Sequence, residues 1–126
     1  MADNLLIDSS VIIDGLRKHK PAVDFIEAVQ VINISIVTAT ELIHGCNNKA
    51  DQLKIEKLLS EYIIFNISEE ISEKAYELIV LCFLKNGMGL GDALIASTCI
   101  LNNLTLVTKD KAHFQNIPSL KTLDAY

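Results

Sequence analysis

The sequence contains no tryptophan, and its 126 residues include only three tyrosines, four phenylalanines, five glycines and two prolines. Half of the residues are hydrophobic, and that proportion together with little Gly and Pro excludes an intrinsically disordered chain. Because aromatic side chains are scarce, aliphatic side chains must fill most of the core. The length suits one compact domain, so we take residues 1–126 as a single domain.

Cysteine is also rare, and the three that occur are Cys46, Cys82 and Cys99. They form no CxxC pair and each lies in an apolar stretch, which favours buried, reduced thiols over a disulfide or a zinc site. The N-terminus lacks the basic segment and long apolar run of a signal peptide. The longest apolar runs, such as 78–84, are too short to span a bilayer. We therefore expect a cytoplasmic protein that does not engage a membrane.

Positive charge is in short supply, since the net charge is −5 and Arg17 is the single arginine. This balance argues against a protein that coats nucleic acid by neutralising phosphates. It does not exclude an enzyme, because carboxylates gathered around a metal ion would themselves make the total negative. The basic cluster 17–20 either guides a polyanion or simply complements the dipole at a helix end.

Short apolar segments alternate with amphipathic ones along the chain. The first kind predicts strands at 4–7, 31–37, 63–67, 104–107 and 120–123. The second predicts helices at 11–17, 21–29, 50–61, 68–85 and 92–101. A further helix should begin at the capping-box pattern of Thr38 and Glu41, which would place Glu41 in its first turn. This order predicts a three-layer α/β/α fold with a central, mostly parallel five-stranded sheet.

Four acids fall just beyond the predicted strands or at helix starts: Asp8, Glu41, Asp92 and Asp110. Ligand sites of open parallel sheets lie at the carboxyl ends of the strands, so these acids are expected to converge. Each acid has a simpler interpretation. Glu41 and Asp92 would suit a helix N-terminus, and Asp8 and Asp110 would suit turns. Asp8 is the firmest candidate, because it directly interrupts a buried strand.

Carboxylates that converge repel one another unless their pKa values rise or a cation binds between them. Mg²⁺ prefers oxygen ligands and usually keeps several waters. A cation of this kind can polarise a phosphoryl oxygen and orient an in-line displacement, which points to phosphodiester hydrolysis.

Four segments around these acids resemble the PIN-domain family, and in particular the VapC-type toxins of bacterial and archaeal toxin–antitoxin pairs. Residues 6–13 (LIDSSVII) resemble the opening motif of the family, and residues 38–45 (TATELIHG) resemble the second. Residues 91–97 (GDALIAS) and 106–110 (LVTKD) resemble the third and fourth. The four motifs occur in order and cover essentially the whole chain.

The resemblance implies a five-stranded parallel sheet and an endoribonuclease that depends on Mg²⁺ or Mn²⁺. Asp8, Asp92 and Asp110 would then bind the metal, and Glu41 would position the nucleophile directly or through water. The fourth motif varies within the family, so Asp110 is the acid most open to an auxiliary role.

The resemblance also implies supporting residues and partners. Ser10 and Thr108 would be hydroxyls that orient carboxylates or contact phosphate, although the family often has Asn where Ser10 stands. Lys109, Lys111 and Arg17 are candidates for binding RNA. A toxin would be homodimeric and would have an antitoxin protein as its partner. Exposed apolar positions around Leu16, Phe25 and the helix at 50–61 are the candidate contact surface.

Other functions are less well supported by the motifs. The histidines have neither HxxH nor HxH spacing, and residues 87–91 (GMGLG) do not form a nucleotide-binding loop. A haloacid-dehalogenase-like phosphatase needs a DxD after the first strand, but Ser9 and Ser10 follow Asp8. Two alternatives remain open: an RNA-processing nuclease outside a toxin pair, and a PIN-like scaffold that binds protein or RNA without cutting it.

Overall fold

The computed structural model describes residues 4–126, and helices alternate with short strands along this part of the chain. The strands are β1 (Leu5–Ile7), β2 (Asn33–Ser35), β3 (Ile63–Phe65), β4 (Thr105–Val107) and β5 (Lys121–Leu123). The helices are α1 (Ser9–Leu16), α2 (Lys20–Ala28), α3 (Ile36–His44), α4 (Lys49–Leu59), α5 (Glu69–Asn86), α6 (Leu90–Asn102) and α7 (Lys111–Phe114).

All strand pairs are parallel. The strands β1, β4 and β5 form one sheet in that order, and β2 pairs with β3 in a second. The two sheets meet where β2 lies beside β1, and the side-chain amide of Asn33 donates a hydrogen bond to the carbonyl of Leu5 at 2.9 Å. The predicted α/β class and parallel arrangement are confirmed. The five strands form sheets of three and two, however, and not one continuous sheet.

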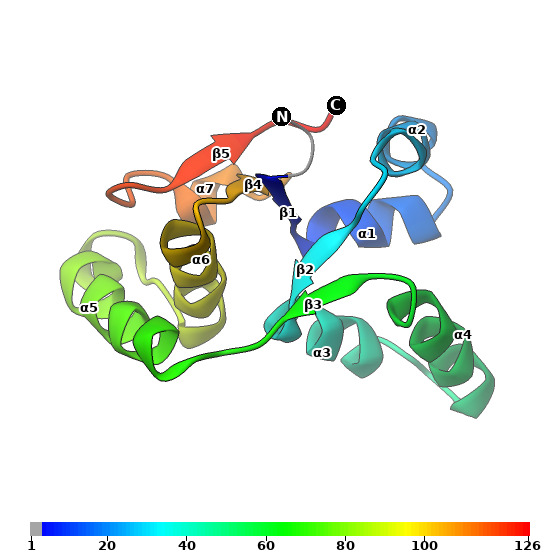
Figure 1. Ribbon diagram of the computed structural model, residues 1–126, viewed down its shortest axis with the longest axis horizontal. Coiled ribbons are helices and arrows are strands. Elements are labelled where there is room, and N and C mark those ends of the chain that lie inside the picture. Colours follow the sequence, from blue (N-terminus) through cyan, green and yellow to red (C-terminus); the bar gives the residue numbers. More distant parts are fainter. Residues whose placement is uncertain (1–3) are drawn as a thin grey trace.

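Hydrophobic clusters cover both faces of the strands, because successive side chains of a strand point to opposite faces. Leu6 and Leu106 belong to a cluster with the buried faces of α5 and α6. Leu5, Ile7 and Val107 belong to a second cluster, which includes residues of α1 and α3. Figure 1 shows this division: α5 and α6 lie on one side of β1 and β4, and α1 to α4 lie on the other. The predicted three-layer arrangement is therefore confirmed.

The start of α3 differs from the sequence prediction. Ser35, not Thr38, is the N-cap, and its hydroxyl accepts a hydrogen bond from the amide of Val37 at 3.0 Å. The predicted strand at 31–37 thus ends at Ser35, because the β-branched residues that follow it enter the helix. Glu41 consequently lies in the second turn, and Thr38 is buried with no hydrogen-bond partner for its hydroxyl. Tertiary packing here overrides the strand propensity of the segment.

Most other boundaries agree with the sequence to within a few residues. Ser68 caps α5 by accepting a hydrogen bond from the amide of Ile71 at 3.1 Å, and Gly87 ends the helix in the left-handed conformation at φ 68°. A β-carbon would be strained at that φ, which explains the glycine. Among residues 4–126, no helix is long and apolar enough to cross a membrane.

The three cysteines carry free thiols. Cys82 and Cys99 are buried, whereas Cys46 is partly exposed, so the prediction of buried thiols holds for two of the three. Burial, and secondarily the nearby charge of Asp8, raises the pKa of Cys99 to about 12. This thiol therefore stays protonated behind the acidic site at neutral pH.

Candidate active site

Asp8 follows β1 directly and is only 6% exposed. Its backbone amide donates to the carbonyl of Val107 at 2.9 Å, which extends the pairing of β1 with β4 by one step. One carboxylate oxygen, Oδ2, accepts hydrogen bonds from Ser10 Oγ and Thr108 Oγ1, each at 2.8 Å. Two hydroxyls thus compensate this buried charge and fix its orientation.

The same two hydroxyls join the segments that follow β1 and β4. Thr108 Oγ1 accepts the backbone amide of Asp110 at 2.9 Å, and Ser10 Oγ accepts the amide of Lys109 at 3.0 Å. Thr108 is fully buried, so its hydroxyl is shielded from competing water. The position of Asp110 is consequently tied to that of Asp8 through one threonine. Sequence reasoning named Ser10 and Thr108 as supporting hydroxyls, and the structure places both beside Asp8.

Glu41 and Asp92 complete the group from two helices, α3 and the first turn of α6. Burial raises the pKa of Glu41 above its ordinary value, a hydrogen bond with Ser9 opposes this, and the charges of Asp8 and Asp92 raise it further. Burial likewise raises the pKa of Asp92, to which the charges of Asp8 and Asp110 add. The four acids predicted from sequence therefore lie close enough to repel one another.

His113 is a member of this group that the sequence did not reveal. Its Nδ1 lies 2.9 Å from Asp110 Oδ2 and 3.4 Å from Asp92 Oδ2. The histidine also lowers the pKa of Asp92, which opposes the effect of burial. The one feature of the sequence that could have indicated this contact is the spacing of His113, three residues after Asp110 at the start of a helix. A search for HxxH or HxH spacing does not detect a histidine that pairs with acids.

The donor set suits a hard cation, because it consists of carboxylate oxygens whose mutual repulsion a cation would relieve. In residues 4–126, however, no three His, Cys, Asp or Glu side chains form a group that could hold a metal ion as they stand. The chemistry of the acids fits Mg²⁺ or Mn²⁺, and their side chains are spread more widely than direct coordination by three of them requires.

The lysines predicted to bind RNA are engaged by the C-terminal tail, residues 124–126. Lys109 Nζ donates to the backbone oxygen of Tyr126 at 2.7 Å and lies 4.5 Å from the centre of its ring. Lys111 Nζ pairs with Asp124 at 2.7 Å. Both lysines border the acids, but the tail satisfies their charges in this conformation.

The tail itself is anchored on α1 and the turn after it. The Tyr126 hydroxyl donates to Asp14 Oδ2 at 2.6 Å, and its ring lies 5.5 Å from that of His19. Asp14 is therefore a partly buried partner of the tail. No sequence pattern indicated this contact, which joins residues far apart in the chain.

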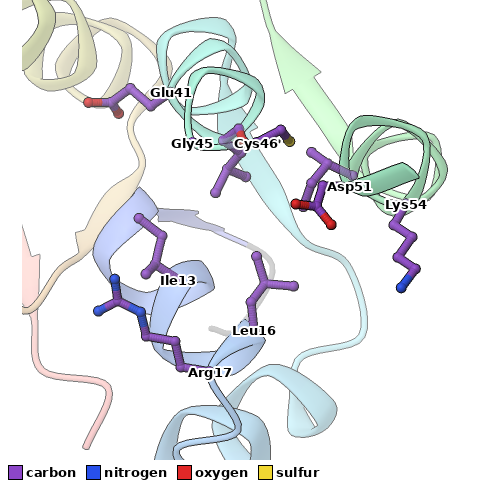
Figure 2. A pocket seen from close by; sticks show the side chains of 10 residues that line it. Ile13, Leu16, Arg17, Glu41, Gly45, Cys46, Asp51 and Lys54 are labelled. Carbon is purple, nitrogen blue, oxygen red and sulfur yellow. Dashed lines mark hydrogen bonds between the residues drawn. The ribbon is translucent and has the colours of Figure 1, made fainter. Parts of the chain in front are cut away.

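A cavity of about 370 Å³ lies between α1, α3 and α4, and Glu41 is among its lining residues. Its apolar lining includes Ile13, Leu16 and Ile55. Figure 2 shows the Glu41 carboxylate at one end, pointing away from Gly45 and out of the cavity.

Some of the residues predicted to contact RNA or a partner protein border this cavity, and others do not. Arg17 follows α1 at the cavity and is not paired with any of the four acids. Of the positions predicted to contact a partner, Leu16 and α4 border the cavity. Phe25 does not, because it packs partly buried against the second hydrophobic cluster.

Comparison with known proteins gives consistent matches over nearly the whole chain. The family model described as the PIN domain matches residues 5–120. Ribonuclease VapC1 of Methanocaldococcus jannaschii is 33% identical over 118 residues, which cover 90% of this chain and 80% of that protein.

Two solved structures share the fold. One is a toxin–antitoxin complex from Klebsiella pneumoniae, with a TM-score of 0.79 and 28% identity over 97% of this chain and 98% of the other. The second is VapBC2 from Rickettsia felis bound to a DNA fragment from its promoter, with a TM-score of 0.81 and 27% identity over 95% and 97%. Because the family model covers β1 to β4 and all four acids, the chain belongs to the PIN-domain family.

Proposed function

We propose that this protein is a metal-dependent endoribonuclease and that Asp8, Glu41, Asp92 and Asp110 form its catalytic group. The observation that carries the proposal is the convergence of these acids from four separate elements. Asp8 and Asp110 are joined through Thr108, and the charges of Asp8 and Asp92 raise the pKa of Glu41. A fold has no structural need for repelling carboxylates at one edge of a sheet, which favours a functional role.

In this proposal Asp8, Asp92 and Asp110 hold Mg²⁺ or Mn²⁺, with Ser10 and Thr108 fixing Asp8. The bound cation would supply charge stabilisation at the phosphoryl group and a more acidic water. Glu41, whose raised pKa makes it a better proton acceptor than an ordinary glutamate, orients the attacking water. Lys109 and Lys111 contact RNA phosphates after the tail releases them, and Arg17 contacts more distant phosphates.

Cleavage assays with purified protein test this function. Single-stranded and structured RNAs are incubated with Mg²⁺, Mn²⁺ or EDTA, and the products are mapped. We expect cleavage with either metal, none with EDTA, and a loss of at least about 100-fold in Asp8→Asn and in Asp92→Asn. Asp24→Asn is a matched control, since Asp24 is exposed on α2 and, within residues 4–126, forms an ion pair only with Lys20. Cleavage that survives the combined Asp8→Asn and Asp92→Asn variant would contradict the mechanism.

We further propose that the protein is the toxin of a toxin–antitoxin pair and that the antitoxin occupies the cavity between α1 and α4. Much of the cavity lining is apolar, although Arg17, Asp51 and Lys54 also border it. The cavity reaches Glu41 at one end, so an inserted segment would cover this acid. Leu16, which is 48% exposed at the cavity, offers a contact for such a segment.

Co-expression with the product of a small upstream reading frame tests this part of the proposal. Expression of the chain alone should arrest growth, and the neighbouring protein should restore it. Leu16→Glu should abolish the rescue while Leu101→Glu, a similarly exposed leucine on α6, should leave it intact. Harmless expression with intact RNA cleavage would instead favour an RNA-processing nuclease. Absence of both activities would favour a binding scaffold.

We also propose a homodimer formed through the outer face of α5. Tyr76, Val80, Phe83 and Leu84 recur at helical spacing on this face and are all more than half exposed, Leu84 at 94%. Figure 1 shows α5 at the edge of the molecule, with α6 between it and β4. Large contiguous apolar surfaces are rare on monomers, and a two-fold dimer buries the same patch on both copies.

Sedimentation analysis tests the dimer. Leu84→Glu should convert it to a monomer at micromolar concentration, whereas Leu53→Glu on α4 should not. A monomeric wild-type protein would rule the dimer out. We also propose that residues 1–126 act as one domain. We propose a cytoplasmic location as well, which agrees with the three free thiols.

A further inference from the structure

His113 contacts two of the four acids but has no role in the mechanism proposed above. His113 touches two carboxylates that come from different parts of the chain, Asp92 at the start of α6 and Asp110 just before α7. Its Nδ1 is 2.9 Å from one and 3.4 Å from the other. Within residues 4–126, it is the only basic side chain that pairs with either acid.

The surroundings of His113 hold the imidazole in place without burying it. The adjacent Phe114 is 3% exposed and packs into the cluster formed with α5 and α6. The backbone amide of His113 donates to the carbonyl of Asp110 at 3.2 Å, which closes the first turn of α7. The side chain of His113 is nevertheless 60% exposed, so core packing does not explain its orientation. The fixed backbone places the ring where one nitrogen faces both acids.

We propose that His113 is a positioning residue, which holds the Asp92 and Asp110 carboxylates together in the orientation in which they bind the cation. The inference rests on the proposed function, because it concerns the same metal site. Without His113 the two carboxylates repel each other across the gap between α6 and α7. The His113 nitrogen lies within 3.4 Å of one oxygen of each carboxylate and leaves the other oxygen of each free for a metal. Partners of this kind strongly affect metal affinity.

Mn²⁺ binding in the absence of RNA tests the inference independently of cleavage. Free Mn²⁺ is measured by electron paramagnetic resonance as protein is titrated, for the wild type, His113→Ala, His113→Gln and Asp92→Asn. We expect His113→Ala to weaken binding by about 10- to 100-fold. His113→Gln, whose amide retains a donor, should recover part of the loss. His44→Ala is the matched control, since His44 is exposed on α3 and pairs with no acid in residues 4–126.

RNA kinetics provide a second measurement. For His113→Ala, kcat at fixed metal concentration should fall while KM for RNA stays unchanged, and excess Mn²⁺ should restore kcat. Circular dichroism checks that each variant remains folded. Unchanged or tighter Mn²⁺ binding by His113→Ala, with binding still lost in Asp92→Asn, would overturn the role of His113 alone. A wild-type protein that binds no Mn²⁺ would overturn the proposed metal site itself.

Discussion

Replacing Thr108 with valine removes the hydroxyl that links Asp8 to Asp110 and leaves the side-chain shape almost unchanged. Two hydrogen bonds disappear: the one donated to Asp8 Oδ2 at 2.8 Å and the one accepted from the Asp110 amide at 2.9 Å. The first involves a charged, 6% exposed carboxylate, and such bonds contribute about 1.5–3 kcal/mol. Because the freed amide is only partly buried, water can compensate most of the second loss. We expect a decrease in unfolding free energy of about 2–3 kcal/mol.

Urea unfolding followed by far-ultraviolet circular dichroism measures this change, since the chain has no tryptophan to serve as a fluorescent probe. Thr98→Val is the matched control. Thr98 is also fully buried, but its hydroxyl donates to a neutral partner, the carbonyl of Leu94 one helical turn earlier, at 2.7 Å. Its loss should cost about 1 kcal/mol. The m-values should stay equal, which would show that only stability changed.

A double-mutant cycle that combines Thr108→Val with Ser10→Ala tests whether both hydroxyls stabilise the same carboxylate. Ser10 donates to the same oxygen of Asp8, also at 2.8 Å, but it is partly exposed, so water can replace its hydroxyl. Removing both hydroxyls leaves the buried carboxylate with neither donor, and the double variant should lose about 1 kcal/mol more than the sum of the singles. Equal losses in Thr108→Val and Thr98→Val, together with additivity in the cycle, would refute the claim that these hydroxyls stabilise the Asp8 charge.

Three further perturbations follow from the same structure. The pKa values of Glu41 and Asp92 lie above their ordinary values of 4.5 and 3.8, so the folded state binds these protons more tightly than the unfolded state. Metal-free wild type should therefore lose stability as pH rises from about 4 through the raised pKa values, and thermal melts of the Glu41→Gln and Asp92→Asn double variant should show less of this loss. Thr38→Val should raise the urea-unfolding free energy by about 1 kcal/mol, because it removes a buried hydroxyl that has no partner; a decrease would show that the hydroxyl is satisfied. Asp124→Asn should release Lys111 and lower KM for RNA a few-fold at low salt, with no difference at 1 M salt, where exposed charges are screened. An unchanged KM at low salt would place Lys111 outside the RNA contact.

The strands and the convergence of the acids could be predicted because their causes are local or follow from parallel topology. Asp8 interrupts an apolar strand whose neighbour in the sheet ends one residue before Thr108, so the two loops meet wherever β1 pairs with β4. The alternating pattern of strands and helices indicates that pairing in advance. The loops after β1 and β4 leave the sheet at the same edge, so Asp8 and Asp110 must lie close together.

The features that escaped prediction depend on contacts between distant segments. The segment at 31–37 has the β-branched composition of a strand, but Ser35 ends the strand, and packing draws Ile36 and Val37 into α3. His113 meets Asp92 only because the four-residue helix α7 packs beside α6. The tail contact of Tyr126 with Asp14 spans nearly the full chain. No local pattern carries information of this kind.

The buried thiol of Cys99 can report how often α6 opens locally. Cys99 lies on α6, as does Asp92, and its pKa of about 12 leaves almost no reactive thiolate at neutral pH. A thiol reagent should therefore modify the partly exposed Cys46 first and reach Cys99 only when α6 detaches from the sheet. The modification rate of Cys99 would then give the free energy of that local opening. If a cation slows the modification of Cys99, the decrease in rate would measure how much the bound cation stabilises α6, the helix that carries Asp92, against local opening.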